Sequence, residues 1–189
     1  MTASIVTPDW SAIPAPADDG AARHLTGLRL PSVSLVATDG TAIDLTALPG
    51  RVVVYAYPRT GDPTAPNPDG WDRIPGARGC TPQSCAFRDQ FAELTALGVS
   101  HLYGLSTQDT PYQAEAAARL HLPFALLSDA DLRLARAIDL PTFAAGGMTL
   151  LKRLTLVVED GTVAKVFYPV FPPDRGADEV RDWLVEAGR

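Results

Sequence analysis

Two cysteines, the only ones in the chain, lie close together in the segment IPGARGCTPQSCAFRD at residues 74–89. At such close spacing, Cys80 and Cys85 can form a redox pair, supply half of a metal site, or be two buried thiols. Two cysteines are too few for the disulfide framework of a small secreted domain. In a reducing compartment, a close pair is more often catalytic, redox-sensing or metal-binding than structural.

The residues around Cys80 predict that it begins a helix. Gly79 precedes it, and Pro82 suits a first helical turn because its missing N–H group is not needed there. Apolar side chains then recur at helical spacing as far as Gly98, a typical C-terminal cap: Cys85, Phe87, Phe91, Leu94 and Leu97. Unpaired N–H groups and the dipole at a helix start favour a thiolate, and Arg78 adds positive charge nearby. Cys80 is therefore the predicted nucleophile.

A disulfide between Cys80 and Cys85 conflicts with a regular helix. Five residues of α-helix separate two Cα atoms by about 8 to 9 Å, whereas a disulfide needs less than about 7 Å. The first turn or two of the helix must unwind before the bond can form. We therefore expect two conformations of the site, one reduced and helical and the other oxidised and unwound.

Two other interpretations of the cysteines remain open from the residues alone. Free cysteine is among the residue types most often buried, so Cys85 in particular also suits the role of core filler. A zinc site needs a tetrahedral set of ligands, and His24, His101 and His121 do not stand at ligand spacing from the cysteines. We expect no metal and no other cofactor.

The elements that must position these cysteines predict an α/β domain over residues 28–189, preceded by an irregular arm at 1–27. A β-hairpin turns at Asp39-Gly40 within 28–45, a buried strand covers 51–57, and a loop rich in proline and glycine covers 59–79. Further along we expect strands at 101–106 and 124–128, helices at 110–121, 129–138 and 178–187, and within 148–170 two antiparallel strands joined at Asp160-Gly161. A mixed sheet flanked by helices, with a strand, a loop and a cysteine-bearing helix in succession, predicts a thioredoxin-like fold.

Composition excludes several classes of function. The formal net charge is -6 with a sequence pI of about 4.9, and no Lys/Arg cluster offsets it, which argues against nucleic-acid binding. The longest apolar runs are far shorter than a membrane span, and no basic region followed by an apolar one opens the chain. At 189 residues the chain suits one domain, and we expect it to be cytoplasmic.

The cysteine segment also resembles a known motif. GCTPQSCAFRD (79–89) is similar to the active-site helix of peroxiredoxins of the bacterioferritin-comigratory, or peroxiredoxin Q, class, whose order is Gly-Cys-Thr-x-x-x-Cys-x-Phe-Arg-Asp. VVVYAYP (52–58) resembles the strand before that class's active-site loop, and LPFALLSDAD (122–131) resembles another of its segments. KRLTLVVEDG (152–161) is similar to the strand with the family's arginine. These pieces occur in the family's order over roughly residues 27–188.

The resemblance implies a thiol peroxidase with Cys80 as peroxidatic and Cys85 as resolving cysteine. Hydrogen peroxide or an organic hydroperoxide would oxidise Cys80 to sulfenic acid, Cys85 would form an intramolecular disulfide with it, and a thioredoxin-type dithiol would reduce the disulfide. Arg153 matches the family's arginine, which would keep the thiolate ionised and polarise the peroxide. Pro58, Gly79 and Thr81 match peroxide-site positions. The resemblance also favours a monomer.

One family residue is missing. The class carries a threonine three residues before the peroxidatic cysteine, and here that residue is Ala77, in a longer loop. Thr60, or else Thr64, is the candidate to supply the hydroxyl instead. Trp71 and Asp72 in the same loop are candidates to cover the site, and FYPVFPPD (167–174) is a candidate apolar wall, although plain packing explains both as well.

Two other functions remain open. A thiol–disulfide oxidoreductase acting on proteins is disfavoured, because a Cys-x-x-Cys pair is expected for that chemistry. A redox-sensing or interaction module, in which the disulfide switches a binding surface, stays possible because the loop before Cys80 departs from the family's.

Overall fold

The computed structural model describes residues 9–188. The first eight residues of the predicted arm and the last residue of the predicted domain lie outside the described residues. Where the arm is described, it is irregular apart from one 3₁₀ turn, η1 (Trp10–Ala12).

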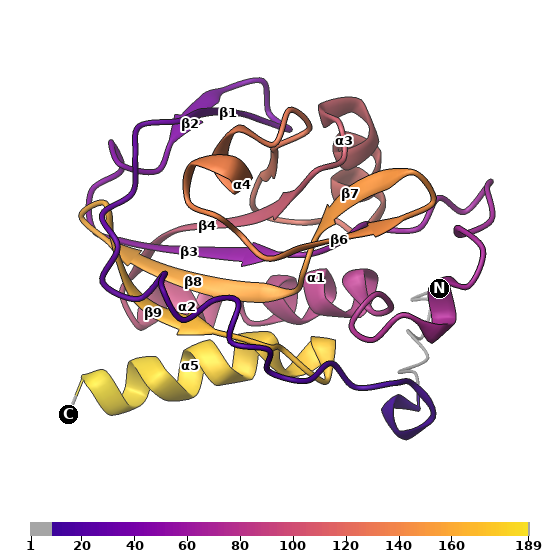
Figure 1. The fold of residues 1–189 in the computed structure, drawn as a ribbon. Coiled ribbons are helices and arrows are strands. Elements are labelled where there is room, and N and C mark those ends of the chain that lie inside the picture. Colours follow the sequence, from indigo (N-terminus) through magenta and orange to yellow (C-terminus); the bar gives the residue numbers. More distant parts are fainter. Residues whose placement is uncertain (1–8, 189) are drawn as a thin grey trace.

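A mixed sheet of seven strands forms the centre of the fold, in the order β2-β1-β5-β4-β3-β8-β9 (Figure 1). Its strands are β1 (Ser34–Ala37), β2 (Ala42–Asp44), β3 (Arg51–Ala56), β4 (Val99–Ser106), β5 (Leu126–Ser128), β8 (Leu154–Glu159) and β9 (Thr162–Phe167). The central strand β3 pairs parallel with β4 and antiparallel with β8. The predicted thioredoxin-like mixed sheet and the N-terminal hairpin β1–β2 are confirmed.

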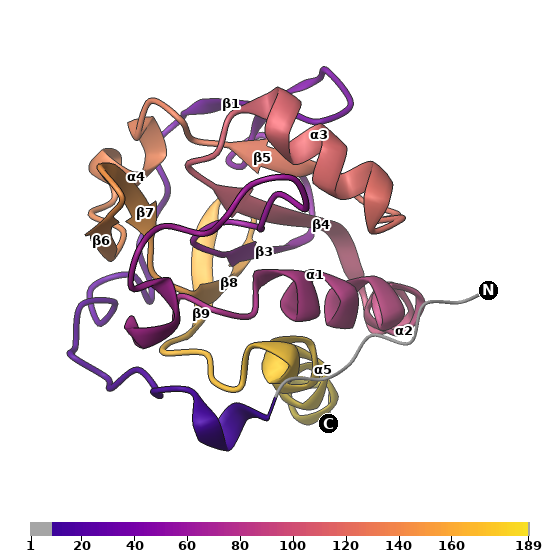
Figure 2. The same cartoon turned by 90° about the vertical axis from the view of Figure 1, so that its right-hand side faces the viewer.

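The helices are α1 (Cys80–Asp89), α2 (Phe91–Ala96), α3 (Thr110–Arg119), α4 (Arg133–Ala137) and α5 (Gly176–Ala187), with 3₁₀ turns η2 (Trp71–Arg73) and η3 (Pro173–Arg175). Helices α1, α2 and α5 lie together on one side of the sheet, and α4 lies on the other (Figures 1 and 2). The cysteine-bearing helix is therefore enclosed between the sheet and α5.

Strand β3 shows how the sequence pattern builds this arrangement. Its side chains alternate between two buried clusters because successive side chains of a strand point to opposite faces. Val52, Val54 and Ala56 join the cluster that α4 covers. On the other face, Val53 and Tyr55 join the cluster that α1, α2 and α5 cover. Burial on both faces is what the continuous apolar run of this segment predicts.

Two predicted helices differ from the structure. The helical pattern that begins at Cys80 is interrupted at Gln90, whose backbone leaves the helical conformation (φ -98°, ψ 4°), so that α1 and α2 are separate helices. Nothing in the local residue types marks this break. The helix expected at 129–138 begins only at Arg133, because Leu132 takes a left-handed conformation and the Asp129 carboxylate accepts hydrogen bonds from the backbone N–H groups of the first turn.

The strands expected within 148–170 are three rather than two. The first run divides into β7 (Met148–Leu151) and β8, and β7 pairs with β6 (Thr142–Ala145), which the sequence analysis did not find. β6 and β7 form a separate two-stranded sheet. The dipeptide Gly146-Gly147 between two short apolar runs was a sequence signal for this hairpin turn. Both glycines have positive φ in the structure.

Candidate active site

The sheet brings the cysteine loop and Arg153 to the same edge. β3 and β8 are antiparallel with Ala56 opposite Leu154. The end of β3, where the buried Pro58 begins the long loop, therefore lies beside the start of β8, and Arg153 immediately precedes β8. The loop then returns to this edge at Cys80, the first residue of α1.

Arg153 and Cys80 are in direct contact. Arg153 Nη2 lies 3.3 Å from Cys80 Sγ, and each residue is only 3% exposed. The same nitrogen lies 3.2 Å from the carbonyl oxygen of Gly76 and 3.0 Å from that of Arg78. A buried guanidinium held by loop carbonyls places positive charge and N–H donors at the sulfur, which stabilises a thiolate and an oxygen that gains negative charge there.

Gln83 is the residue that the sequence analysis overlooked. Arg153 Nη1 donates to Gln83 Oε1, and both side chains are buried. Gln83 lies three residues after Cys80, on the same face of α1, so the arginine bridges the first turn of the helix. The available signal was a glutamine four residues before Phe87, on the apolar face of the predicted helix, because buried polar side chains need a hydrogen-bond partner.

The backbone conformation and the close packing at position 79 both require glycine. Its φ of 102° lies in the left-handed region that favours glycine, and it is the N-cap of α1. A Cβ atom at this position would lie 2.5 Å from Pro173 Cγ. The segment 167–174 therefore packs directly against the residue before Cys80. Thr81 follows as the second residue of α1 and is half-buried.

Ala77, at the position of the missing threonine, is fully buried. It forms a small apolar cluster with Trp71 and Leu150. Its carbonyl oxygen lies 3.7 Å from Cys80 Sγ and accepts a weak hydrogen bond from the thiol. Trp71 thus covers this part of the loop, whereas Asp72 is exposed and pairs with Arg78 at 3.4 Å.

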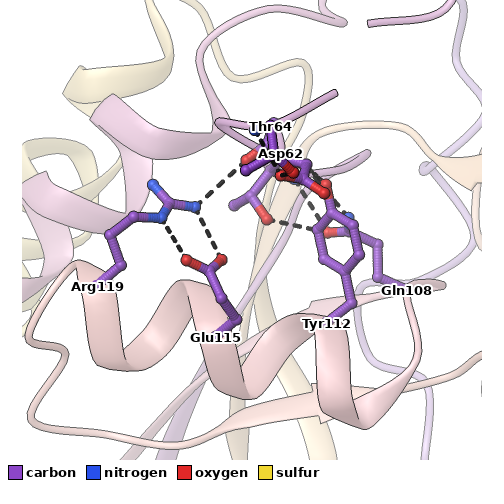
Figure 3. A network of polar contacts seen from close by, with 8 residues as sticks. Asp62, Thr64, Gln108, Tyr112, Glu115 and Arg119 are labelled. Carbon is purple, nitrogen blue, oxygen red and sulfur yellow. Dashed lines mark hydrogen bonds and ion pairs between the residues drawn. The ribbon is translucent and has the colours of Figure 1, made fainter. Parts of the chain in front are cut away.

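A hydrogen-bond network around Gln108, Tyr112 and Arg119 attaches the long loop to α3 and the residues before it (Figure 3). Thr60 takes part in this network. Its hydroxyl donates to Gln108 Oε1 at 3.3 Å, and its carbonyl oxygen accepts from the Tyr112 hydroxyl at 2.9 Å. Thr64 bonds to Asp62 instead. The hydrogen bonds described for Thr60 and Thr64 do not include one to Cys80.

Cys85 lies on the same helix in a different environment. It is buried, and both cysteines are free thiols. Burial raises the pKa of the Cys85 thiol above its ordinary value because the thiolate is poorly solvated there, although Arg88 partly opposes this shift. Five positions of regular α-helix separate it from Cys80. The structure is thus the reduced, helical form of the pair.

A cavity of about 270 Å³ reaches the arginine from the side of the arm. Arg153 and Gly76 line it together with apolar residues from the arm, the long loop, β6 and the segment 167–174, among them Pro16, Ile74, Phe143 and Pro169. Among residues 9–188, no group of three His, Cys, Asp or Glu side chains is placed to hold a metal ion. No helix in that range is both long and apolar enough to cross a membrane.

This geometry defines a thiol-based redox site on a thioredoxin-like scaffold, and comparison with known proteins agrees. The Redoxin family model matches residues 25–181. Peroxiredoxin Bcp of Escherichia coli K12 is 31% identical over 161 residues, covering 82% of this chain and 92% of the relative. The chain belongs to the Redoxin family, in the peroxiredoxin Q/Bcp class.

Other relatives are longer or more distant. The chloroplastic peroxiredoxin Q of Gentiana triflora is 33% identical over 159 residues, covering 83% of this chain. The chain spans only 65% of that protein's length, a little under two thirds. Among solved structures, peroxidoxin BcpB of Mycobacterium tuberculosis has a TM-score of 0.69 at 28% identity, covering 87% of this chain and 97% of its own. The Xanthomonas campestris bacterioferritin comigratory protein shares the fold, with a TM-score of 0.67 at 23% identity and coverage of 85% and 98%.

Proposed function

We propose that this chain is a thiol peroxidase that reduces hydrogen peroxide and organic hydroperoxides. The observation that carries the proposal is the contact of 3.3 Å between Arg153 Nη2 and Cys80 Sγ at the start of α1. A buried guanidinium and the backbone N–H groups of a helix start both favour the sulfur anion, which is the form that attacks peroxides. Class membership supports the same reaction.

In the first step, the Cys80 thiolate attacks one oxygen of the peroxide. An S–O bond forms as the O–O bond breaks, so that Cys80 becomes a sulfenic acid, and the other peroxide oxygen leaves as water or an alcohol after taking up a proton. Arg153 stabilises both the thiolate and the negative charge that develops on the leaving oxygen. Gly79, Thr81 and Pro58 form the backbone and apolar surroundings in which the peroxide binds.

In the second step, the Cys85 thiol attacks the Cys80 sulfenic acid. A disulfide forms and one water molecule leaves, so the two electrons that reduced the peroxide have come from the two thiols. Because α1 holds the cysteines too far apart for a disulfide, this step requires α1 to unwind. A dithiol protein of the thioredoxin type then reduces the disulfide by thiol–disulfide exchange.

The substrate class has support from two related structures. The Xanthomonas campestris protein is described by its alkyl peroxide reduction activity, and Prx3 of Vibrio vulnificus was solved in complex with hydrogen peroxide. A role of Thr60 in peroxide binding is a prediction from the sequence, and in the structure its hydroxyl donates to Gln108. A monomeric state, a cytoplasmic location and the lack of nucleic-acid or membrane partners remain predictions from the sequence.

Stopped-flow oxidation of three proteins tests the proposal: wild type, Cys80→Ser and Cys85→Ser. We expect wild type to react with hydrogen peroxide far faster than free cysteine does, and Cys80→Ser to lose this reaction. Cys85→Ser should keep the first step and accumulate a sulfenic acid that a dimedone-type reagent traps. If Cys80→Ser reacts as fast as wild type, the mechanism is wrong. A wild-type rate no higher than that of free cysteine would favour a redox-sensing module instead.

A further inference from the structure

The N-terminal arm touches the active site at the residue before Cys80. The Trp10 ring lies against Gly79, where an added Cβ would come within 2.9 Å of Trp10 Cη2. Trp10 Nε1 donates to Asp174 Oδ2 at 3.0 Å, and its ring packs in a T-shaped arrangement with Phe171, with centroids 6.2 Å apart. Trp10 is therefore fixed by a hydrogen bond and by aromatic packing while it covers the N-cap of α1.

Two further contacts of the arm also reach neighbours of the reactive pair. Pro16 packs against Gly76, whose carbonyl oxygen accepts a hydrogen bond from Arg153. The carboxylate of Asp19 pairs with Lys152 Nζ at 2.5 Å and accepts from the Tyr168 hydroxyl at 2.7 Å. The arm thus runs along the outer side of the site from Gly79 to the residue before Arg153.

These contacts are not part of the region that defines the family. The Redoxin match begins at residue 25, after all three contact residues of the arm. The arm therefore supports the first turn of α1 from outside the range that the family model matches. That turn begins with the hydrogen bond from the Gln83 backbone N–H to the Gly79 carbonyl oxygen, 3.0 Å long.

We propose that Trp10 is a positioning residue that clamps the Gly79–Cys80 turn in its helical form. Unwinding the first turn moves Gly79 away from Trp10 and Pro173, so the clamp opposes the conformation in which the disulfide forms. Trp10 thereby keeps Cys80 beside Arg153 for the reaction with peroxide, and it slows the attack of Cys85. The effects on the peroxide reaction and on disulfide formation rest on the proposed peroxidase function, whereas the clamp on the Gly79–Cys80 turn does not.

Amide hydrogen exchange of the reduced protein tests the clamp without any turnover. In Trp10→Ala, the amide of Gln83 should exchange about fivefold faster than in wild type, as loss of one ordinary hydrogen bond implies. Amides of β3 should keep their rates. The matched control is Ser11→Ala, an exposed residue of the same turn whose hydroxyl donates to Asp9 Oδ1. Unchanged exchange at Gln83, or equal acceleration in β3 and α1, would overturn the proposal.

A rapid-quench experiment tests the consequence for the reaction. After one equivalent of hydrogen peroxide, mass spectrometry follows the sulfenic acid and the disulfide in Trp10→Ala, Ser11→Ala and wild type. We expect the disulfide step to accelerate about fivefold in Trp10→Ala while the first step does not accelerate. An unchanged or slower disulfide step contradicts the proposal. Failure of wild type to react refutes the peroxidase function and leaves the exchange result to decide on the clamp.

Trp10→Phe provides a second variant in case Trp10→Ala does not fold. It keeps a ring against Gly79 and loses the hydrogen bond to Asp174. We expect Gln83 exchange in this variant to lie between those of wild type and Trp10→Ala, at about twice the wild-type rate. Suppose that Trp10→Ala is unfolded and that Gln83 in Trp10→Phe exchanges at the wild-type rate. The hydrogen bond to Asp174 then does not stabilise the first turn of α1, and the clamp is overturned.

Discussion

The Tyr55 hydroxyl on β3 donates a hydrogen bond of 3.1 Å to Ser84 Oγ, inside the helix between the two cysteines. Both side chains are fully buried. Phe87, one turn further along α1, stacks on the Tyr55 ring with centroids 4.4 Å apart. The sheet thus holds α1 at the segment that has to unwind before Cys80 and Cys85 can form a bond.

Removing this hydrogen bond should destabilise the reduced protein. We expect Tyr55→Phe to lower the free energy of unfolding by about 1 kcal/mol, since the ring packing stays and the buried hydrogen bond is lost. Chemical denaturation of the reduced protein measures it. Ser84→Ala completes a double-mutant cycle with Tyr55→Phe, and a coupling energy near zero would show that the two hydroxyls do not interact.

Oxidation should lower the helix content of the protein. Because α1 must unwind for the disulfide to form, we expect far-UV circular dichroism to show less helix in the peroxide-oxidised protein than in the reduced one. Cys85→Ser treated in the same way is the control, since it cannot form the intramolecular disulfide. Identical spectra of oxidised and reduced wild type, with the disulfide confirmed by mass spectrometry, would exclude unwinding.

Arg153 should be needed for the first step. Arg153→Met removes the charge and the N–H donors from Cys80 Sγ, and we expect the rate constant with peroxide to fall by about 100-fold or more, as for other preorganised donors. Stopped-flow kinetics at constant pH measures this effect.

Arg78→Gln is the matched control for that variant. It also removes a cation close to Cys80, but this side chain is 43% exposed and paired with Asp72. Solvent screens an exposed charge, so the rate should change by no more than about twofold. If both variants lose the same factor in rate constant, the positive charge around Cys80 as a whole matters, and the buried contact with Arg153 has no special role.

Cys85 should react as a poor nucleophile in the folded protein. Burial raises its pKa above the ordinary value of 9.0, so the folded form holds the proton more tightly than the unfolded chain does. Alkylation of Cys85 in Cys80→Ser should therefore be slower than in the same variant in denaturant, and its rate should level off at a higher pH. By linkage, the contribution of Cys85 to stability is complete below pH 9 and is lost as pH rises through the raised pKa. Equal alkylation profiles in folded and denatured protein would contradict the raised pKa.

Much of the fold could be predicted from residue patterns. The run of β-branched and aromatic residues at 51–57 predicted a central strand, and Asp39-Gly40 and Asp160-Gly161 predicted two hairpins, all of which the structure contains. The break at Gln90 could not be predicted in this way, because no local residue type requires it. The hydrogen bond from Gln90 Nε2 to Asp178 Oδ1, 2.5 Å long, joins this point to a helix far along the chain.

Residue order alone predicts the chemistry: a cysteine at a helix start, a second cysteine five residues later, and a spacing that prevents a disulfide within a regular helix. These depend on residue types and on local helix geometry. Only the tertiary structure showed that Arg153 contacts Cys80, that Gln83 and loop carbonyls hold this arginine, and that Trp10 covers Gly79. Such contacts join residues far apart in the chain, and they depend on strand pairing and on the path of the arm, which local patterns do not encode.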